Sequence, residues 1–233
     1  MSIQFERAEI SLKKQVIDSM RKAIVEGVFA PGQKLVEREL CELFGVSRPL
    51  IREALQKLEA EALITIVPHR GPMVAEITLE EGRSIYAVRQ ALEALAGAGC
   101  ADNATEDDIA ALESCLQRIE RCGSGDVDQK RLVQAKNEFY AVLLQSCGNA
   151  IAREILTGLN NRINALRRLS MSQPGRLSDT VKELREIIVA IRNRDADLAS
   201  RLCAEHVSKA ADIALAVMAE QQDEQAGSRA AMA

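Results

Sequence analysis

The sequence predicts a mainly α-helical protein with an N-terminal winged helix-turn-helix domain and a C-terminal all-α helical bundle. Apolar residues recur at helical spacing along most of the 233 residues. Three helical stretches and one β-hairpin are predicted before Thr78, and no strand-like alternation is found after it. We therefore expect two domains, residues 1–77 and 78–221, followed by a small, polar and disordered tail at 222–233.

The first two helices are predicted from amphipathic stripes that end at glycine. In "SLKKQVIDSMRKAIVEGVF" one apolar stripe includes Val16, Met20 and Ile24, and Gly27 with the following "APGQ" ends the helix. The shorter run "LVERELCELFG" is also amphipathic and stops at Gly45. A three-residue turn then leads to another helix, which is the spacing of a helix-turn-helix.

The third helix begins in the segment "SRPL". Ser47 stands at the N-cap position, where its hydroxyl can accept a backbone N–H, and Pro49 falls in the first turn, where its missing N–H costs nothing. Arg48, Arg52 and Gln56 follow at intervals of four residues, so they share a face that is distinct from the apolar stripe. The helix is therefore expected to present two arginines on one polar face.

A hairpin is predicted after this helix, because "LITIVP" and "PMVAEI" are β-rich runs around "PHRG". In a winged helix-turn-helix the second helix of the motif enters the DNA major groove, while the hairpin reaches the backbone or the minor groove. Arg48 and Arg52 suit guanine O6 and N7. Arg38 is placed to meet phosphate or a base, and Ser47 to meet phosphate. The alternative is that these arginines form only a solvated helix face.

The remainder is predicted to consist of six amphipathic helices separated by Gly, Asn and Pro. Their expected ranges are about 79–101, 105–122, 127–147, 149–170, 178–194 and 195–221. Two starts are marked by a hydroxyl three residues before a carboxylate: Thr78 with Glu81 is a capping box, and Thr105 with Asp108 is its weaker Asp analogue.

Composition excludes several classes of protein. No apolar run approaches the roughly 20 residues that span a bilayer, and the N-terminus lacks the apolar core of a signal peptide, so we expect a cytoplasmic protein without membrane contact. The six cysteines are scattered without a C-x-x-C pair, and are expected to be reduced. The net charge is −4, and residues 1–77 hold 11 basic and 11 acidic residues, so any DNA binding depends on where the positive charges lie.

The segment "AIVEGVFAPGQKLVERELCELFGVSRPLIREALQKLEAEALITIVPHRGPMV" closely resembles the winged-helix domain of GntR-family transcriptional regulators. The resemblance implies that Arg38, Arg48 and Arg52 contact DNA, and that the wing does so through His69, Arg70 and Gly71. One departure is Pro49, which stands where family members often have Thr. By its residues alone, His69 is more readily a polar turn residue than a metal ligand.

The helical remainder is similar to the ligand-binding domain of the FadR subfamily, often called FCD. The similarity rests on "IYAVRQALEALAGAGCA", "NEFYAVLLQSCGNA", "GRLSDTVKELREIIVAIRNRDADLA" and "EHV". It implies a homodimeric regulator, expected to be a repressor at a palindromic operator, whose helical domain dimerises and binds a small organic acid.

Members of that subfamily commonly hold a divalent metal with one Asp and three His. At the matching positions this chain has Lys136, Tyr140, Leu184 and His206, so we expect no metal and no other cofactor. An organic anion would instead be held by Lys136 and Arg89, with Tyr140 and His206 as neutral donors. Alternatively, Lys136 snorkels to solvent and Tyr140 fills core.

Two other functions remain open at this stage. In the first, the helical domain no longer senses an effector and serves only to dimerise a constitutive DNA-binding regulator. In the second, the protein is an enzyme with a DNA-binding appendage, which the sequence disfavours because it shows no activated nucleophile, no Gly-rich phosphate loop and no convincing pair of carboxylates.

Overall fold

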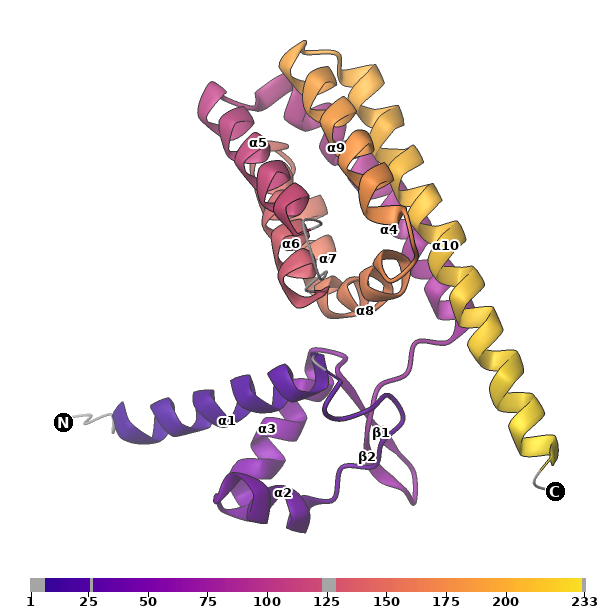
Figure 1. Cartoon of the computed structure of the whole chain (residues 1–233). Coiled ribbons are helices and arrows are strands. Elements are labelled where there is room, and N and C mark those ends of the chain that lie inside the picture. Colours follow the sequence, from indigo (N-terminus) through magenta and orange to yellow (C-terminus); the bar gives the residue numbers. More distant parts are fainter. Residues whose placement is uncertain (1–6, 26, 123–128, 232–233) are drawn as a thin grey trace. The chain divides into compact units, whose positions relative to one another are not determined.

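The computed structural model describes residues 7–25, 27–122 and 129–231, and the chain divides into two compact units, 1–77 and 78–233. Within the described residues, the first unit combines helices with one short hairpin and the second consists of helices (Figure 1). The mainly α-helical fold predicted from the sequence is thereby confirmed. No helix in the described part of the chain is long and apolar enough to cross a membrane.

The first unit consists of α1 (Arg7–Val25), α2 (Glu37–Phe44), α3 (Arg48–Ala60), β1 (Ile64–Val67) and β2 (Gly71–Val74). The predicted apolar stripes meet in one core, where Met20, Ile51 and Leu58 are completely buried. α3 packs against α1, α2 and β1, so burial of its apolar stripe leaves the opposite, polar face outward.

The turn of the helix-turn-helix depends on Gly45. This residue ends α2 in the left-handed region, with φ of 64°, and its backbone N–H donates to the carbonyl of Cys41. Glycine adopts that conformation without the steric penalty of a Cβ. The hairpin that follows α3 is antiparallel, with Ile64 opposite Val74 and Val67 opposite Gly71.

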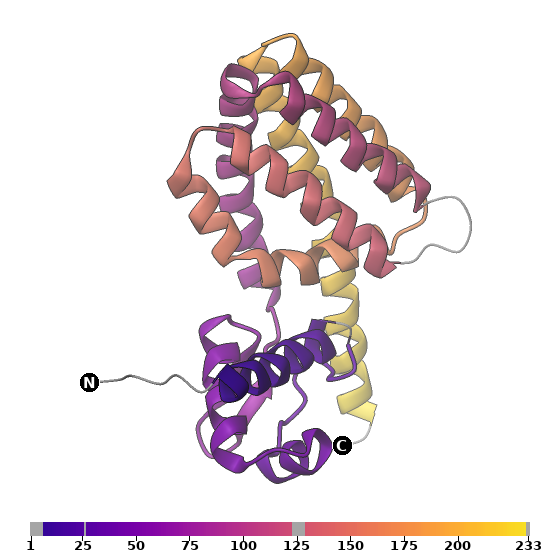
Figure 2. The same ribbon diagram turned by 90° about the vertical axis from the view of Figure 1, so that its left-hand side faces the viewer.

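The second unit is a bundle of α4 (Leu79–Asn103), α5 (Glu106–Arg121), α6 (Gln129–Ser146), α7 (Ala150–Gly158), α8 (Asn160–Met171), α9 (Arg176–Arg192) and α10 (Ala196–Ala231). α4 and α10 lie side by side (Figures 1 and 2). A Cβ at Gly97 would lie 2.8 Å from the Ala199 carbonyl oxygen and 2.6 Å from Cys203 Sγ, so this close packing requires glycine.

Three details differ from the sequence analysis. The expected helix 149–170 is divided into α7 and α8 at Leu159, directly after Gly158, because glycine in a helix interior is unfavourable. The expected disordered tail is wrong for its described part, because α10 continues to Ala231. Extending an existing helix through Ala, Gln and Glu residues needs no new nucleation.

The third difference is that the capping box at Thr105 is the complete one. Thr105 N donates to Asp108 Oδ2 at 2.9 Å, and Asp108 N donates back to Thr105 Oγ1 at 3.2 Å. At Thr78 the hydroxyl accepts from Glu81 N at 3.1 Å, whereas the Glu81 carboxylate lies 3.3 Å from Arg162 Nε. A competing ion pair therefore draws the longer carboxylate away from the cap.

Candidate functional sites

The first candidate site is the outward face of α3 with the first turn of α2. Arg48 and Arg52 lie one turn apart, and their side chains are 65% and 59% exposed. Both pair with Glu37: Arg48 Nε lies 2.6 Å from Glu37 Oε2, and Arg52 Nε lies 3.0 Å from Glu37 Oε1. Both guanidinium groups thus remain accessible at the start of the helix that would enter a major groove.

Two further predicted contact residues flank this pair. Arg38 on α2 is 77% exposed and lies 3.6 Å from Glu42, which is a loose surface pair. Ser47 is the N-cap residue of α3, as predicted, but its side chain makes no capping hydrogen bond. Its hydroxyl is therefore not engaged by the helix end, and the position is exposed.

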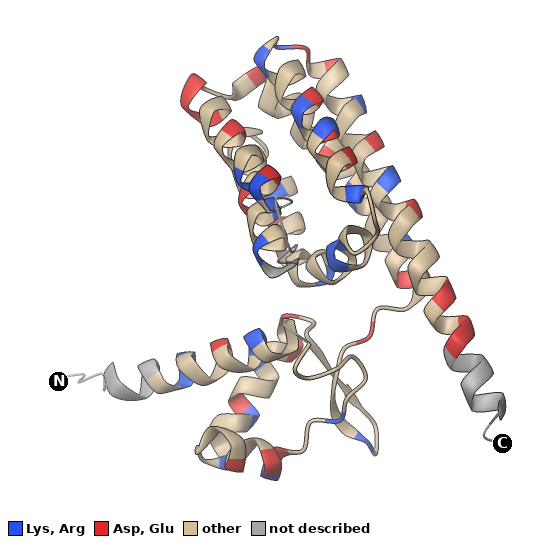
Figure 3. Cartoon of the chain, in the orientation of Figure 1, with Lys and Arg blue, Asp and Glu red and all other residues tan. Residues whose placement is uncertain are grey.

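The predicted wing residues form the turn between β1 and β2. His69 and Gly71 adopt left-handed backbone conformations, with φ of 64° and 84°, and Arg70 N donates to the Val67 carbonyl at 3.1 Å. His69 and Arg70 are both exposed. Positively and negatively charged residues both occur along the helices of this unit (Figure 3).

The second candidate site is the charged centre of the helical unit. Among its described residues, four basic side chains are buried with only two acidic ones; they are Arg89, Lys136, Arg167, Arg176, Glu93 and Glu183. Burying a charge is costly unless it is paired. The centre therefore holds more positive charge than its own carboxylates compensate.

Part of this charge is paired internally. Arg89 Nε donates to Glu93 Oε1 at 2.8 Å, and Arg176 donates through two nitrogens to the Glu183 carboxylate, both at 2.8 Å. His206 Nδ1 lies 2.5 Å from Glu183 Oε2. Burial would raise the pKa of Glu183, but hydrogen bonds from His206 and Arg176 hold it at about 2.

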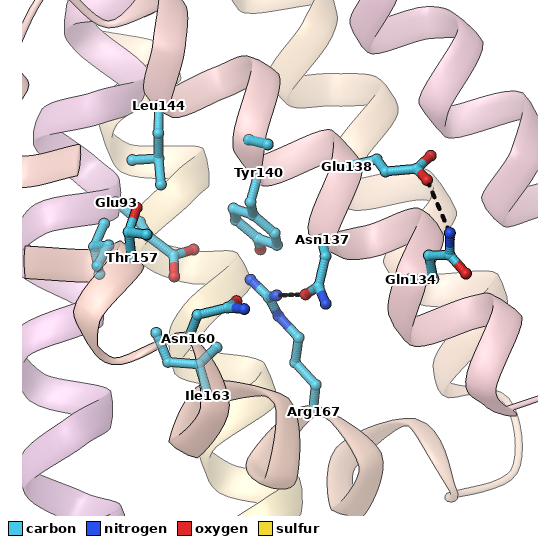
Figure 4. A pocket seen from close by; sticks show the side chains of 12 residues that line it. Glu93, Gln134, Asn137, Glu138, Tyr140, Leu144, Thr157, Asn160, Ile163 and Arg167 are labelled. Atoms are coloured by element: carbon cyan, nitrogen blue, oxygen red, sulfur yellow. Dashed lines mark hydrogen bonds between the residues drawn. The ribbon is translucent and has the colours of Figure 1, made fainter. Parts of the chain in front are cut away.

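A cavity of about 410 Å³ lies beside this centre, and its lining includes one basic side chain, Arg167, and two carboxylates, Glu93 and Glu138. Arg167 on α8 points into it beneath the ring of Tyr140, with the guanidinium carbon 4.2 Å from the ring centroid, and donates to Asn137 Oδ1 (Figure 4). Arg167 Nε and the Tyr140 hydroxyl are buried and have no hydrogen-bond partner. These are two unsatisfied donors at the wall of one cavity, an arrangement suited to an anion.

Three helices, α6, α7 and α8, supply most of the lining of the cavity. Asn137 and Tyr140 project from α6, whereas Thr157, Asn160 and Ile163 come from α7 and α8. The break at Leu159 turns the chain so that both short helices face the same space. Amide and hydroxyl groups beside Arg167 could hydrogen-bond the polar part of a small acid.

Of the four residues that the sequence analysis assigned to an effector, only Tyr140 lines this cavity. Arg89 and His206 are buried and paired with Glu93 and Glu183. Lys136 does not snorkel to solvent: its side chain is fully buried, and Nζ lies 3.7 Å from Met171 Sδ. Burial, together with the neighbouring Arg167 and Arg176, lowers the pKa of Lys136 well below its usual value.

Arg167 was missed, although the sequence contains a signal for it. Ile163, Leu166, Arg167 and Ser170 fall at i, i+3, i+4 and i+7, so this arginine occupies a position in a buried helical stripe. The segment "NRINALRRLS" contains three arginines, and the sequence analysis did not establish which of them faces the core. Burial and Arg89 lower the pKa of Arg167 to about 10, which leaves its guanidinium charged near neutral pH.

The divalent metal of related domains does not fit the residues present here. Lys136 and Leu184 offer no ligand, so His206 is the one imidazole among the four matching positions. Among the described residues, no three His, Cys, Asp or Glu side chains are grouped so that they could hold a metal ion. The surrounding excess of positive charge also disfavours a cation.

A helix-turn-helix with two exposed arginines and a wing, followed by a helical unit with a polar cavity, defines a DNA-binding transcription regulator. Family models described as "Bacterial regulatory proteins, gntR family" and "FCD domain" match residues 12–74 and 84–209. The chain therefore belongs to the GntR family of bacterial regulatory proteins, in the group with an FCD domain, and is not an enzyme.

Curated relatives agree with this assignment. The chain is 27% identical over 217 residues to the HTH-type transcriptional repressor RspR of Escherichia coli, covering 91% of this chain and 92% of the relative. It is 28% identical over 208 residues to the galactonate operon transcriptional repressor of Escherichia coli, covering 80% and 90%.

Solved structures share the fold. A GntR regulator from Rhodococcus sp. RHA1 superposes with a TM-score of 0.74 at 24% identity, covering 88% of this chain and 98% of the other. Escherichia coli McbR/YncC gives a TM-score of 0.72 at 21% identity, covering 91% and 98%.

Proposed function

We propose that this protein is a homodimeric repressor that binds a palindromic DNA operator and responds to a small organic acid in its helical unit. The observation behind the second part is the cavity that Arg167 and Tyr140 line with unpartnered donors. Two curated relatives named as repressors support the direction of regulation.

DNA recognition is assigned to Arg38, Ser47, Arg48 and Arg52, with His69, Arg70 and Gly71 of the wing. Arg48 and Arg52 are the proposed base readers, because they are exposed at the start of α3. Arg70 at the wing tip is the proposed contact to phosphate or a groove wall.

The DNA test uses a duplex selected by the full-length protein from a random library, compared with a scrambled duplex of equal composition. Arg48→Ala or Arg52→Ala should each cost about 1–3 kcal/mol on the selected duplex and relax base preference. Arg70→Ala should weaken both duplexes more evenly. Unchanged base preference in both α3 variants would refute their role as readers.

The effector is proposed to be a carboxylate whose oxygens accept from Arg167 Nε and the Tyr140 hydroxyl. Lys136 and Arg89, the anchors predicted from the sequence, are buried but do not line this cavity, and Arg89 is paired with Glu93. The site is proposed to be free of metal, because the residues at the ligand positions do not suit one.

The effector test is a thermal-shift screen of the full-length protein over small carboxylic acids. A ligand at 100 times its Kd should stabilise the native state by about 2.7 kcal/mol. Tyr140→Phe removes only the hydroxyl and Arg167→Met only the charged head, so each should reduce the shift; Arg192→Met, at an exposed ion pair on α9, should not. If no acid binds, the helical unit serves to dimerise the protein without sensing.

The dimer contact is proposed to involve α4 and α7, which pack against each other. Val88 and Leu95 on α4 and Ile151 and Ile155 on α7 are large apolar residues that are 42%, 48%, 65% and 43% exposed. Such exposure is typical of an interface. Leu95→Asp should shift sedimentation toward the monomer, and an unchanged dimer would place the contact elsewhere.

A further inference from the structure

One carboxylate joins the two proposed base-reading arginines. Glu37, in the first turn of α2, accepts Arg48 Nε at 2.6 Å through Oε2 and Arg52 Nε at 3.0 Å through Oε1. Arg52 Nε also lies 3.2 Å from Oε2, so the carboxylate is shared between both guanidinium groups. The hydrogen bonds from Arg52 and Arg48 lower the pKa of Glu37, which keeps it ionised near neutral pH.

The side chain of Glu37 is less exposed than those of Arg48 and Arg52. The Glu37 side chain is 23% exposed, whereas those of Arg48 and Arg52 are 65% and 59% exposed. The carboxylate thus lies beneath the arginines, which continue outward beyond it. A partly exposed carboxylate that binds two long, exposed side chains restricts their rotamers before any DNA arrives.

The choice of nitrogen matters for recognition. Each arginine uses its single Nε–H on Glu37, and a guanidinium has four further N–H groups on its two Nη atoms. The Nη pair is the end that can donate two parallel hydrogen bonds to guanine O6 and N7. The observed ion pairs therefore orient both arginines without consuming that end.

The same negative charge also acts against indiscriminate binding. Sequence-independent affinity for DNA comes mainly from positive charges near phosphates. Glu37 partly neutralises two such charges, and repels phosphate itself, whereas a guanine edge offers acceptors in a fixed geometry.

We propose that Glu37 is a specificity-determining residue, which holds Arg48 and Arg52 in register for guanine edges and reduces their attraction to phosphate. This inference rests on the proposed reading role of the two arginines. Glu37 is a positioning residue: it acts through the arginines and is not assigned a DNA contact of its own.

The test measures binding of full-length parent and variants to the selected and scrambled duplexes at one fixed salt concentration. Glu37→Gln removes the negative charge and replaces one acceptor oxygen by an NH₂ donor, so the side chain holds the two arginines less firmly. We expect affinity for the scrambled duplex to rise and the ratio of the two affinities to fall about tenfold, the value of one lost bidentate pair. Glu37→Ala should lower the ratio at least as much.

The matched control is Glu39→Gln, which makes the same charge change in the same first turn of α2. An acidic residue there also stabilises the helix through its dipole. If Glu37 had only that structural role, both Gln variants would change melting temperature and both affinities alike, and the ratio would stay at the parental value; that outcome would overturn the inference. The inference is supported if the ratio of the affinities for the selected and scrambled duplexes falls in Glu37→Gln but not in Glu39→Gln.

Failure of the inference can be told apart from failure of the proposed reading role. If Arg48→Ala and Arg52→Ala lose base preference while Glu37→Gln keeps it, the arginines read bases without the carboxylate and the inference is wrong. If all three variants keep the parental preference, the reading role itself is wrong, and the inference is refuted with it.

Discussion

The arginines of the two units occupy opposite environments. Arg48 and Arg52 are more than half exposed and share one carboxylate, whereas Arg89 is 1% exposed and bonded to an equally buried Glu93. An exposed ion pair contributes little to stability, so these arginines are not required to hold the fold together. A buried pair is expensive to break, so it fixes the core around it. Burial therefore separates residues suited to recognition from residues that maintain a binding site.

The largest effect should come from breaking the buried pair. Glu93→Ala leaves Arg89 without its carboxylate, close to Arg167, and should lower the free energy of unfolding by about 3–5 kcal/mol in urea titrations. Glu113→Ala removes the partner of Arg192 at a surface pair and should cost about 0–1 kcal/mol. Equal losses in the two variants would show that burial does not distinguish these pairs.

The buried histidine predicts a pH dependence confined to the helical unit. Burial lowers the pKa of His206 to about 4, from about 6.5 in the unfolded chain. The unfolded state therefore binds more protons between these values, and stability falls as pH decreases from about 6.5 to about 4, by on the order of 2 kcal/mol. Glu183, held at about 2, adds a further loss between about pH 4.5 and 2.

His206→Asn should remove the first part of this dependence and also reduce the second, because the hydrogen bond from His206 helps to keep the pKa of Glu183 low. The measurement is the slope of unfolding free energy against pH, which does not depend on the baseline stability of the variant. An unchanged slope between pH 6.5 and 4.5 would contradict the assignment to His206.

The smallest effect concerns two helix caps. Thr105→Ala removes a complete capping box and should cost about 1 kcal/mol of stability. Ser47→Ala removes a hydroxyl without a capping hydrogen bond, so it should cost only about a few tenths of a kcal/mol. Ser47→Ala should instead weaken DNA binding, as loss of a phosphate contact does. A stability loss at Ser47 as large as at Thr105 would show that its hydroxyl caps α3 in solution.

Much of the fold could be predicted because its signals are local. The stripe through Met20, the glycine stop at Gly45 and the caps at Ser47 and Thr105 each depend on residues within about one or two turns. Helix boundaries that depended on weaker signals were less accurate, as the break at Leu159 and the continuation of α10 show. The low helix propensity of Gly158 ended α7, and the extension of α10 needed no new nucleation.

The candidate sites divide in the same way. Local sequence alone placed Arg48 and Arg52 on one outward face, because a helix repeats every 3.6 residues and its apolar stripe must be buried. Only the tertiary structure decided that Glu37 lies under both arginines, 11 and 15 residues away in the chain. It also decided that Arg167 meets Asn137 from 30 residues away, and that Arg89 is occupied by Glu93. Periodicity states which face of a helix is buried, but the partner of a buried charge is set by packing between helices, which no local pattern encodes.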